Sequence, residues 1–266
     1  REFFESAKRI TPRKPIIAFK GGTTAAGARA ARSHSGAMAG VKELYQAAFR
    51  QAGVLWAYNT EEMLEWAAAF SSLPLPKGNR VGILTRGGGW GVITADACNE
   101  LGLEVPSLDE EVAKELDAIL PQFWSRGNPV DMVATIGVEP YVRGLEILIS
   151  WDRVDAVISL SGQAGPLTNI ISDVKKRGEP LFEAEKIERL SQQVAEGRTR
   201  IFDRGCELIR KYRKPIFAVG RNAGRAIPGA QPDFSLAHFR TPERAVHAAA
   251  ALCRYAAYRK SIQKTG

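Results

Sequence analysis

Four short runs of branched apolar residues, separated by helical patterns, constrain the fold of this chain more than any other feature. The runs are P-I-I-A-F (15–19), R-V-G-I-L-T (80–85), V-D-A-V-I-S-L (154–160) and P-I-F-A-V (215–219). Such runs are typical of strands that are buried on both faces of a parallel sheet. Helical periodicity marks intervening segments, at 92–102, 110–120 and 141–149. The alternation predicts an α/β fold with a doubly wound parallel sheet.

The chain also contains an internal repeat. The segment K-P-I-I-A-F-K-G-G at 14–22 reappears as K-P-I-F-A-V-G-R at 214–221, and each copy is followed by a similar helical segment, at 59–70 and 240–252. In both helices a threonine can cap the N-terminus and a glutamate suits the helix dipole. Only the second copy has a full set of strands before it. We therefore expect two related α/β units joined by a Pro- and Gly-containing linker at 71–79, the first unit lacking its N-terminal half, in a piece of a longer chain.

Composition excludes several classes of protein. Apolar residues make up 45% of the chain and charged residues 25%, as in soluble globular proteins. No apolar run approaches the roughly 18 to 20 residues of a membrane span, and the charged N-terminus R-E-F-F-E-S-A-K-R-I is unlike a signal peptide. The scattered Cys98, Cys206 and Cys253 indicate neither a disulfide framework nor a thiolate metal site. They fit a reducing cytoplasm.

The formal net charge of +8 raises the question of nucleic-acid binding. The densest basic cluster, at 209–215, comes just before an expected strand, where Lys and Arg suit the C-terminal end of a helix. The other basic residues are spread along the chain, without the interleaved aromatic residues of single-strand binders. We therefore expect no nucleic-acid partner, and small anionic ligands remain compatible with the charge.

His34, one of three histidines, lies among small residues in a stretch that follows the first expected strand. The stretch is G-G-T-T-A-A-G-A-R-A-A-R-S-H-S-G-A-M-A-G (21–40). A loop after a strand lies at the carboxyl edge of a parallel sheet, where open α/β sheets bind ligands. An imidazole displayed there can act as general base, nucleophile or metal ligand, and the lack of a neighbouring His, Cys or carboxylate cluster disfavours the metal. The alternative is a surface histidine in a flexible loop.

The same stretch resembles a phosphate-binding P-loop only in part. The glycines at 22 and 27 have the required spacing. Ala28 and Arg29 stand where that motif needs Lys and Ser/Thr, so the terminal phosphates would lack their cation. An NTPase of the P-loop class is therefore excluded.

A glycine-rich turn follows the second expected strand. It consists of Gly87, Gly88, Gly89, Trp90 and Gly91. The free N–H groups and partial positive charge of the helix that follows can hold an anion. The turn is not a G-x-G-x-x-G fingerprint and no acidic residue lies at dinucleotide spacing, which disfavours a Rossmann cofactor. Phosphate binding and a tight packing turn both remain open.

Two further features carry weaker signals. The segment R-G-N-P-V-D-M (126–132) makes Asn128 and Asp131 a candidate active-site loop, although a polar turn is the favoured alternative. The segment 161–212 is longer than a crossover requires, so it is a lid, a partner-contact insertion or a solvated helical excursion.

The other two histidines, His238 and His247, we interpret as structural. His247 lies in an alanine-rich helical segment, and His238 lies near an expected strand end.

Residues 20–40 resemble, nearly position by position, a motif of the NDP-forming acyl-CoA synthetases, the superfamily of succinyl-CoA synthetase and ADP-forming acetate–CoA ligase. The motif is K-x-G-x-(T/S)-x-A-G-A-R-A-A-x-S-H-(T/S)-G-(A/S)-x-A-G, and the likeness continues in Y-Q-A-A-F-R-Q-A-G-V at 45–54. The second unit is similar in G-G-G-W-G, in G-L-E-V-P at 102–106 and in G-N-P-V-D at 127–131. The resemblance thus covers nearly the whole chain.

This resemblance implies two flavodoxin-like domains. Residues 1–74 would be the C-terminal half of a succinyl-CoA synthetase-like flavodoxin domain that carries the histidine loop. Residues 75–266 would be a complete second one.

The resemblance also implies a reaction, in which an organic acid, CoA and NTP are converted reversibly to acyl-CoA, NDP and phosphate. The family forms an acyl phosphate and a phosphohistidine at the position of His34. Ser33, Ser35 and Gly36 would form the loop of that histidine. Gly87 to Gly91 would stabilise the phosphate at a helix start. Trp90 is unusual there, because many relatives have a small residue or proline.

The implied cofactors are CoA and ATP or ADP with Mg²⁺, with no metal site in this chain. They would be bound mainly by a CoA-binding Rossmann domain and an ATP-grasp domain that this sequence lacks. We therefore expect the fragment alone to be inactive, and to work in an oligomer with those domains on the same chain or a partner subunit. Related modules also serve as non-catalytic acyl-CoA sensors in larger proteins. Those tend to lack the histidine, so the intact S-H-S-G favours the enzyme.

Overall fold

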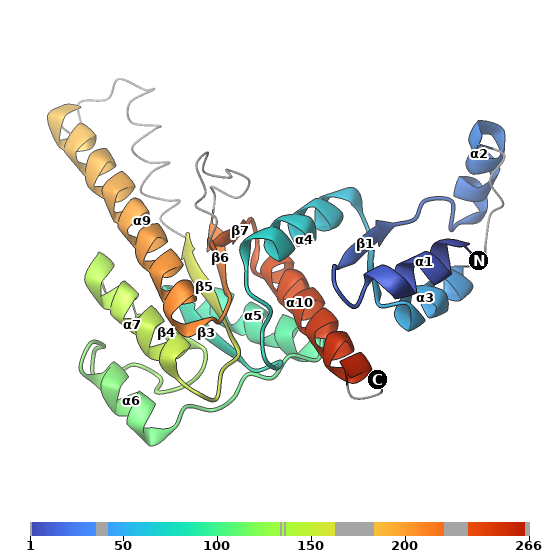
Figure 1. Cartoon of the computed structure of the whole chain (residues 1–266). Coiled ribbons are helices and arrows are strands. Elements are labelled where there is room, and N and C mark those ends of the chain that lie inside the picture. The colour runs from blue at the N-terminus through green and yellow to red at the C-terminus, as the bar shows by residue number, and fades with distance from the viewer. Residues whose placement is uncertain are drawn as a thin grey trace. The chain divides into compact units, whose positions relative to one another are not determined.

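A computed structural model describes residues 2–35, 42–133, 135, 137–162, 184–220 and 234–263. The chain divides into two compact units, Arg1–Ser71 with Ala251–Gly266, and Ser72–Ala250 (Figure 1). The boundary expected from the sequence puts the whole C-terminal helix in the second unit, whereas the structure groups the second half of that helix with the first unit.

The first unit is built around a parallel pair of strands. Its elements are α1 (Glu2–Ile10), β1 (Ile16–Phe19), α2 (Ala25–Ser35), α3 (Lys42–Gln51), β2 (Val54–Ala57) and α4 (Thr60–Ser72). In the strand pair, Ile16 lies opposite Val54 and Phe19 opposite Ala57. The core is a small apolar cluster, made of Ala7, Phe49, Ala52 and Val54 with Phe4, Ile16, Ala18, Tyr45 and Trp56 packed against it. The strand expected at 15–19 is confirmed.

The second half of α10 (Pro242–Gln263) is attached to this unit through Thr11, which is fully buried. The hydroxyl of Tyr255 donates a hydrogen bond to the Thr11 carbonyl at 2.9 Å, and the hydroxyl of Tyr258 lies 2.9 Å from Thr11 Oγ1. Tyr258 also packs on Gly53, where a Cβ would lie 2.2 Å from its ring and where φ is +68°. These contacts are the physical reason why the last helix divides between the units.

Helix α4 begins with a side-chain cap, but the capping residue is Asn59 rather than the expected threonine. The Asn59 side-chain oxygen accepts a hydrogen bond from the Glu62 N–H at 2.8 Å. The Glu62 carboxylate in turn accepts one from the Tyr58 N–H at 2.6 Å. This reciprocal arrangement satisfies donors that the first helical turn leaves open.

The second unit contains a sheet of five parallel strands with helices on both faces. Its elements are β3 (Val81–Thr85), α5 (Gly88–Glu100), α6 (Glu110–Asp117), β4 (Val130–Asp131), α7 (Val138–Ser150), β5 (Ala156–Gly162), α9 (Ala184–Tyr212), β6 (Ile216–Gly220), β7 (Ala237–Phe239) and the first half of α10. The strand order is β4-β3-β5-β6-β7, and every pair is parallel. In order of appearance along the chain this is 2-1-3-4-5, the flavodoxin-like order.

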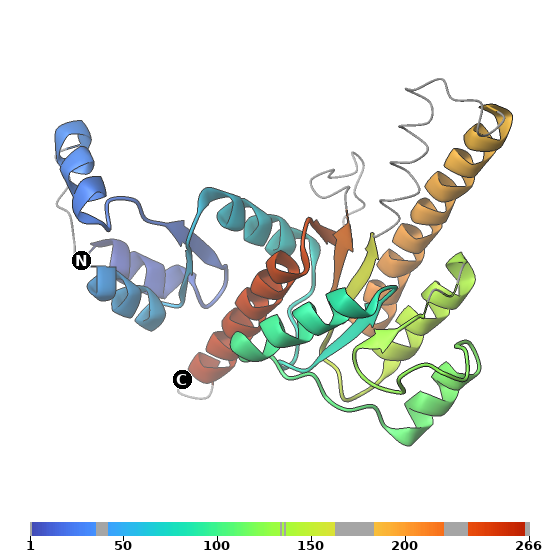
Figure 2. The ribbon, with the colours of Figure 1, turned by 180° about the vertical axis from the view of Figure 1, so that it is seen from behind.

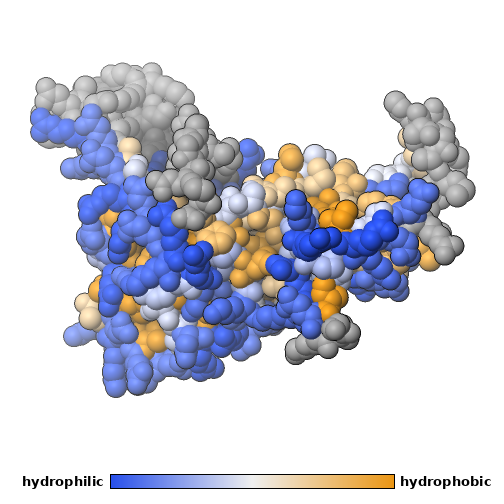
Figure 3. Space-filling model, viewed as in Figure 1, coloured by the Kyte–Doolittle hydropathy of each residue, from blue (hydrophilic) through white to orange (hydrophobic). Residues whose placement is uncertain are grey.

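Helices α7 and α9 cover one face of this sheet, and α5 and the first half of α10 cover the other (Figures 1 and 2). Every residue of β3 is buried, as the apolar runs predicted for strands with both faces covered. The outer surface of α7 and α9 is mostly hydrophilic (Figure 3). The doubly wound parallel α/β fold is therefore confirmed, and two short edge strands, β4 and β7, add to the four apolar runs.

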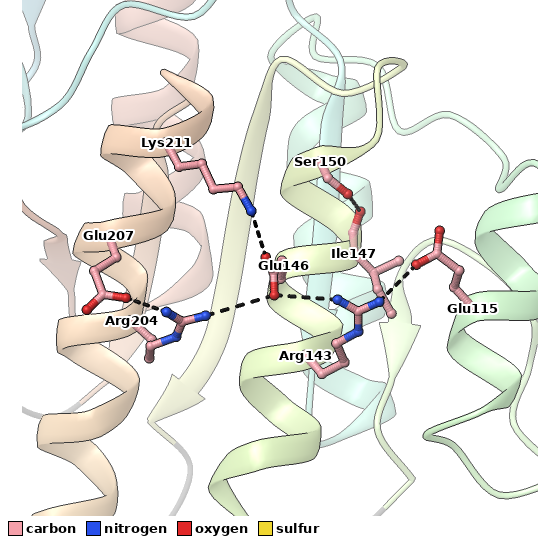
Figure 4. A network of polar contacts seen from close by, with 8 residues as sticks. All are labelled: Glu115, Arg143, Glu146, Ile147, Ser150, Arg204, Glu207 and Lys211. Carbon is pink, nitrogen blue, oxygen red and sulfur yellow. Dashed lines mark hydrogen bonds and ion pairs between the residues drawn. The ribbon is translucent and has the colours of Figure 1, made fainter.

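Glu146 joins the two helices on that face. Its carboxylate lies 3.1 Å from Lys211 Nζ, 3.5 Å from an Arg143 nitrogen and 3.9 Å from Arg204, and Arg204 also pairs with Glu207 (Figure 4). The hydrogen bond from Lys211 holds the pKa of the Glu146 carboxyl below its ordinary value. The Glu146 side chain is 19% exposed, whereas its three partners are about half exposed or more.

Replacing Glu146 by glutamine is expected to lower the free energy of unfolding by about 1 kcal/mol at neutral pH, because a network of charges contributes more than an isolated surface pair. A lowered carboxyl pKa stabilises the fold above the unfolded value of about 4.3, and this stabilisation is lost as pH falls through the folded pKa. Urea unfolding at pH 7 and pH 3 would measure the difference, which should vanish at the lower pH. Glu207→Gln, which removes a single exposed pair, is the matched control and should change stability by less than half as much.

Candidate functional site

The glycine-rich turn lies at the carboxyl edge of the five-stranded sheet, between β3 and α5. Strands β3 and β5 are neighbours, and the chain leaves β3 toward β4 on one side and β5 toward β6 on the other. This reversal is the topological switch point, where open α/β sheets bind ligands. The phosphate loop expected from the sequence therefore lies at this point.

Thr85, the last residue of β3, fixes the shape of the turn. Its hydroxyl donates to the Gly87 carbonyl at 2.9 Å and accepts from the Gly87 N–H at 3.1 Å. Thr85 is fully buried, so these bonds are shielded from water. The turn therefore has one defined conformation.

The N-terminus of α5 has unused hydrogen-bond donors. Gly87 is the N-cap residue in an extended conformation, and no side chain of the described ranges caps the helix. The N–H groups of Trp90 and Gly91 reach the Gly87 carbonyl at 3.2 and 3.4 Å. The N–H groups of Gly88 and Gly89, which precede them, are the donors available to an anion, and the helix dipole adds partial positive charge.

Gly91 allows α5 to approach the sheet closely. A Cβ at position 91 would lie 3.1 Å from Thr85 Cγ2 and 3.2 Å from Pro129 Cβ. At Gly89, two residues earlier, a Cβ would meet nothing within 4 Å. The contacts at Gly91 thus support the packing interpretation left open by the sequence, whereas phosphate binding by the N–H groups of Gly88 and Gly89 stays a prediction.

Gly91→Ala is expected to destabilise the protein by about 1 to 2 kcal/mol, since a buried hydrogen-bonded threonine and a proline ring have little freedom to move aside. Gly89→Ala, the matched control, should instead be neutral or stabilising by up to about 1 kcal/mol through higher helix propensity. Urea unfolding of both variants would measure this. Equal effects of the two substitutions would show that close packing at position 91 is not the reason for its glycine.

The two polar residues of the candidate loop at 126–132 have different surroundings. Asp131 lies at the end of β4 beside the glycine turn, where its Oδ2 would be 3.1 Å from a Cβ on Gly88, and its Oδ1 accepts a hydrogen bond from the Val133 N–H at 3.0 Å. Asn128 instead braces backbone: its Oδ1 accepts from the Ile83 N–H, and its Nδ2 donates to the carbonyls of Val81 and Pro106. The fold thus brings Asp131, and not the side-chain groups of Asn128, to the turn.

Arg86 is the residue between β3 and the glycine turn that sequence reasoning passed over. Its Nη2 donates to the Gly137 carbonyl at 2.7 Å, and its Cζ lies 4.6 Å from the centre of the Tyr141 ring. The Nε atom of Arg86 is buried and has no hydrogen-bond partner among the described residues. The sequence signal that could have found Arg86 was its position, as the first residue after a buried strand at the edge where ligands bind.

His34 lies in helix α2, whereas a loop was expected from its small neighbours. Five of the eleven residues of α2 are alanine, the residue of highest helix propensity. The Gly27 N–H donates to Thr24 Oγ1 at 3.1 Å, as at a capped helix start. Ser33, His34 and Ser35 form the last residues of this helix, and Gly36 lies outside the described residues.

His238, on β7, has the surroundings of a structural residue. It stacks on Phe202 with ring centres 5.8 Å apart and an interplanar angle of 12°. Burial lowers its pKa below the ordinary value for histidine. His247 lies within α10.

Within the described ranges, no group of three or more His, Cys, Asp or Glu residues is arranged to hold a metal ion. The same residues contain no helix long and apolar enough to cross a membrane.

Two family models match the chain. The succinyl-CoA ligase-like flavodoxin domain matches residues 1–70, and the ligase-CoA domain matches residues 81–163. The first range contains the histidine motif, and the second contains the glycine turn, Asn128 and Asp131. Together the two ranges span more than half of the chain.

Similar proteins are CoA ligases by name. The chain is 46% identical over 160 residues to acetate–CoA ligase (ADP-forming) II subunit alpha of Pyrococcus furiosus, a match that covers 60% of this chain and 35% of that one. It is 27% identical over 265 residues to 4-hydroxybutyrate–CoA ligase (ADP-forming) of Nitrosopumilus maritimus. That match covers 98% of this chain and 34% of that one. A solved dinucleotide-forming acetyl-coenzyme A synthetase 1 of Ca. Korarchaeum cryptofilum, in complex with phosphate and ADP, superposes with a TM-score of 0.70 at 29% identity, over 99% of this chain and 51% of that one.

The strand order defines a flavodoxin-like α/β protein, and the glycine turn puts the N-terminus of α5 at its switch point. The domain matches and the relatives show more than the fold class. The chain belongs to the NDP-forming acyl-CoA synthetases, the superfamily of succinyl-CoA synthetase and ADP-forming acetate–CoA ligase. It spans about a third of the length of the sequence relatives and about half of the solved one.

Proposed function

We propose that the chain is the part of an NDP-forming acyl-CoA synthetase that carries the phosphoryl group between two reactions. The complete enzyme converts an organic acid, CoA and NTP reversibly to acyl-CoA, NDP and phosphate. The observation that carries the proposal is the S-H-S-G sequence at 33–36 within a matched succinyl-CoA ligase-like domain, followed in the chain by a second matched domain with an open helix N-terminus.

In the direction of synthesis, a ring nitrogen of His34 attacks the terminal phosphoryl group of NTP, and NDP leaves. The carboxylate of the organic acid then takes the phosphoryl group from the histidine, which gives an acyl phosphate and regenerates the imidazole. The thiol of CoA displaces phosphate from the acyl carbon and forms the thioester. Covalent relay of this kind divides one difficult transfer into easier steps.

The glycine turn and the histidine motif supply binding and charge for these steps. The N–H groups of Gly88 and Gly89 stabilise the phosphoryl oxygens, as donors at a helix start do for developing negative charge. Gly87 to Gly91 hold the phosphate, and Asp131 borders the turn. Ser33, Ser35 and Gly36, the sequence neighbours of His34, are assigned to phosphate binding from the motif. We assign Asn128 to the same loop as a brace of the backbone rather than as a ligand.

The nucleotide, its Mg²⁺ and CoA are proposed to be bound mainly by domains outside this sequence. Support comes from the relatives, whose names include alpha subunits and CoA ligases and of which this chain spans a minor part, and from the solved relative that contains phosphate and ADP. We propose that these domains reside on the same polypeptide or on a partner subunit in a cytoplasmic oligomer.

The test uses the complete protein with its nucleotide-binding part. After incubation with Mg-ATP, mass spectrometry at neutral pH should find an acid-labile phosphate on His34 that ADP removes. A protein that binds the nucleotide but never becomes labelled would contradict the proposal and would leave the non-catalytic acyl-CoA sensor as the function.

A further inference from the structure

Arg86 combines a charge and a location that its contacts do not explain. It stands directly after Thr85, the last residue of β3, and directly before Gly87, the N-cap of α5. A guanidinium group carries five N–H donors in a fixed plane and stays charged at any ordinary pH. In the described part of the chain, one of these donors has a hydrogen-bond acceptor, the Gly137 carbonyl at 2.7 Å.

An unsatisfied buried donor costs free energy. Within the part of the chain that the structure describes, the buried Nε atom of Arg86 has no hydrogen-bond partner. Nearly all buried polar groups in folded proteins are paired, so an orphaned one at a ligand-binding edge calls for a physical account. The charge is also uncompensated, because no carboxylate among the described residues forms an ion pair with Arg86.

The contacts of Arg86 connect the elements that surround the switch point. Its Nη2 holds Gly137, the N-cap of α7, whose φ of +124° is a conformation suited to glycine. Its guanidinium lies over the ring of Tyr141, which is fully buried and whose hydroxyl lies 2.8 Å from the Ser159 hydroxyl on β5. The side chain thereby ties the end of β3 to the start of α7 and, through Tyr141, to β5.

We propose that Arg86 is a positioning residue for the anion site at the start of α5, and that its uncompensated cation raises the affinity of that site for a phosphoryl group. The inference rests on the proposed function of Gly87 to Gly91. Arg86 acts by anchoring the loop before α7 and by placing a permanent positive charge directly before Gly87, the N-cap of α5. An anion that binds at this edge is attracted by the helix dipole and by that charge together.

The two contributions are separable by substitution. Arg86→Lys keeps the charge and a donor for the Gly137 carbonyl. Arg86→Gln keeps a donor but no charge, and Arg86→Met keeps only the aliphatic stem over Tyr141. Arg153→Met is the matched control, since Arg153 also combines a hydrogen bond, to Asp109 at 2.7 Å, with a position over an aromatic ring, that of Trp151. Arg153 comes before β5, at the amino ends of the parallel strands, whereas Arg86 follows β3, at their carboxyl ends.

The experiment measures the dissociation constant of inorganic phosphate by calorimetry on the complete protein, together with its melting temperature. We expect Arg86→Met and Arg86→Gln to weaken phosphate binding about tenfold, Arg86→Lys to stay within about threefold of the parent, and Arg153→Met to bind like the parent. Phosphate affinity that is kept in Arg86→Lys and lost in Arg86→Gln is the result that a merely structural role of Arg86 does not give. If Arg86→Met fails to fold, the comparison of the lysine and glutamine variants decides alone.

Two results would overturn the inference: parental phosphate affinity in Arg86→Gln, or an equal loss of affinity in Arg153→Met. The proposed function is tested separately, by the labelling of His34. Labelling of His34 with no effect of Arg86 on phosphate affinity would reject the inference alone. An Arg86 effect in a protein whose His34 never carries phosphate would reject the relay and keep the anion site.

Discussion

His34→Ala is expected to abolish both the phosphoenzyme and the synthesis of acyl-CoA, with a fall in turnover of at least about 10³-fold, because the substitution removes the nucleophile that carries the phosphoryl group. Binding of the nucleotide should be unchanged, since the proposed nucleotide site lies in other domains. Turnover by coupled assay and labelling by mass spectrometry would measure the two effects in the complete protein.

His247→Gln provides the control for this experiment. His247 lies in α10 and is not assigned to the site. Its replacement should leave the acid-labile phosphate and the turnover within about threefold of the parent, as expected for a substitution away from the reacting groups. Retention of most turnover by His34→Ala would contradict the relay.

The second large effect is expected at Asp155, which is 5% exposed and receives three hydrogen bonds from Arg80. Asp155→Asn should lower the free energy of unfolding by about 2 to 3 kcal/mol, because the partly buried guanidinium of Arg80 loses its charged partner and an amide N–H₂ faces guanidinium donors. The partial exposure of Arg80, at 36%, keeps this below the cost of breaking a fully buried pair. Urea unfolding at neutral pH would measure the change.

The pH dependence of stability gives an independent check on Asp155. Burial alone would raise the pKa of this carboxyl, but the hydrogen bonds from Arg80 outweigh it and hold the pKa below its ordinary value. The stabilisation is therefore present above the unfolded value of about 3.9 and is lost as pH falls through the folded pKa. Parent and Asp155→Asn should converge in stability toward pH 2.

Glu115→Gln is the matched control for the Asp155 variant. Glu115 pairs with Arg143 at 3.2 Å, and both side chains are more than half exposed. Its replacement should change stability by less than about 0.5 kcal/mol, as for other exposed ion pairs. If the two variants differed little from each other, burial would not be what makes the Arg80–Asp155 pair important.

The sequence alone predicted strands β1, β3, β5 and β6 and the doubly wound parallel class, because strands inside a parallel sheet are short runs of branched apolar residues. Strand β2, as long as β1, was not among the predicted runs. The sequence also located the glycine turn, since a strand followed by consecutive glycines and a helix puts N–H groups at the carboxyl edge of a sheet. The histidine motif identified the family in the same way, through residue types at fixed spacing. Local patterns of this kind need no knowledge of distant contacts.

Short edge strands and helix boundaries were not predictable in this way. Strand β4 has two residues and β7 has three, and both exist because a neighbouring strand supplies their hydrogen-bond partners. Alanine content, and not the presence of small residues as such, made residues 25–35 a helix. The N-cap of α4 is Asn59, one residue before the expected Thr60, because the side-chain oxygen of Asn59 reaches the Glu62 N–H.

Residue types by themselves thus determined the fold class, the family and the two positions where chemistry is expected, His34 and the turn at Gly87 to Gly91. The tertiary structure decided which polar residues accompany the turn. Its hydrogen bonds connect Asn128 to the backbone of β3, and its packing brings Asp131 beside Gly88. It also buries a donor of Arg86 that has no partner in the segments that the structure describes. The physical reason is that the partners of a polar side chain are set by segments distant in the chain, which only the register of the strands and the packing of the helices bring within hydrogen-bonding distance.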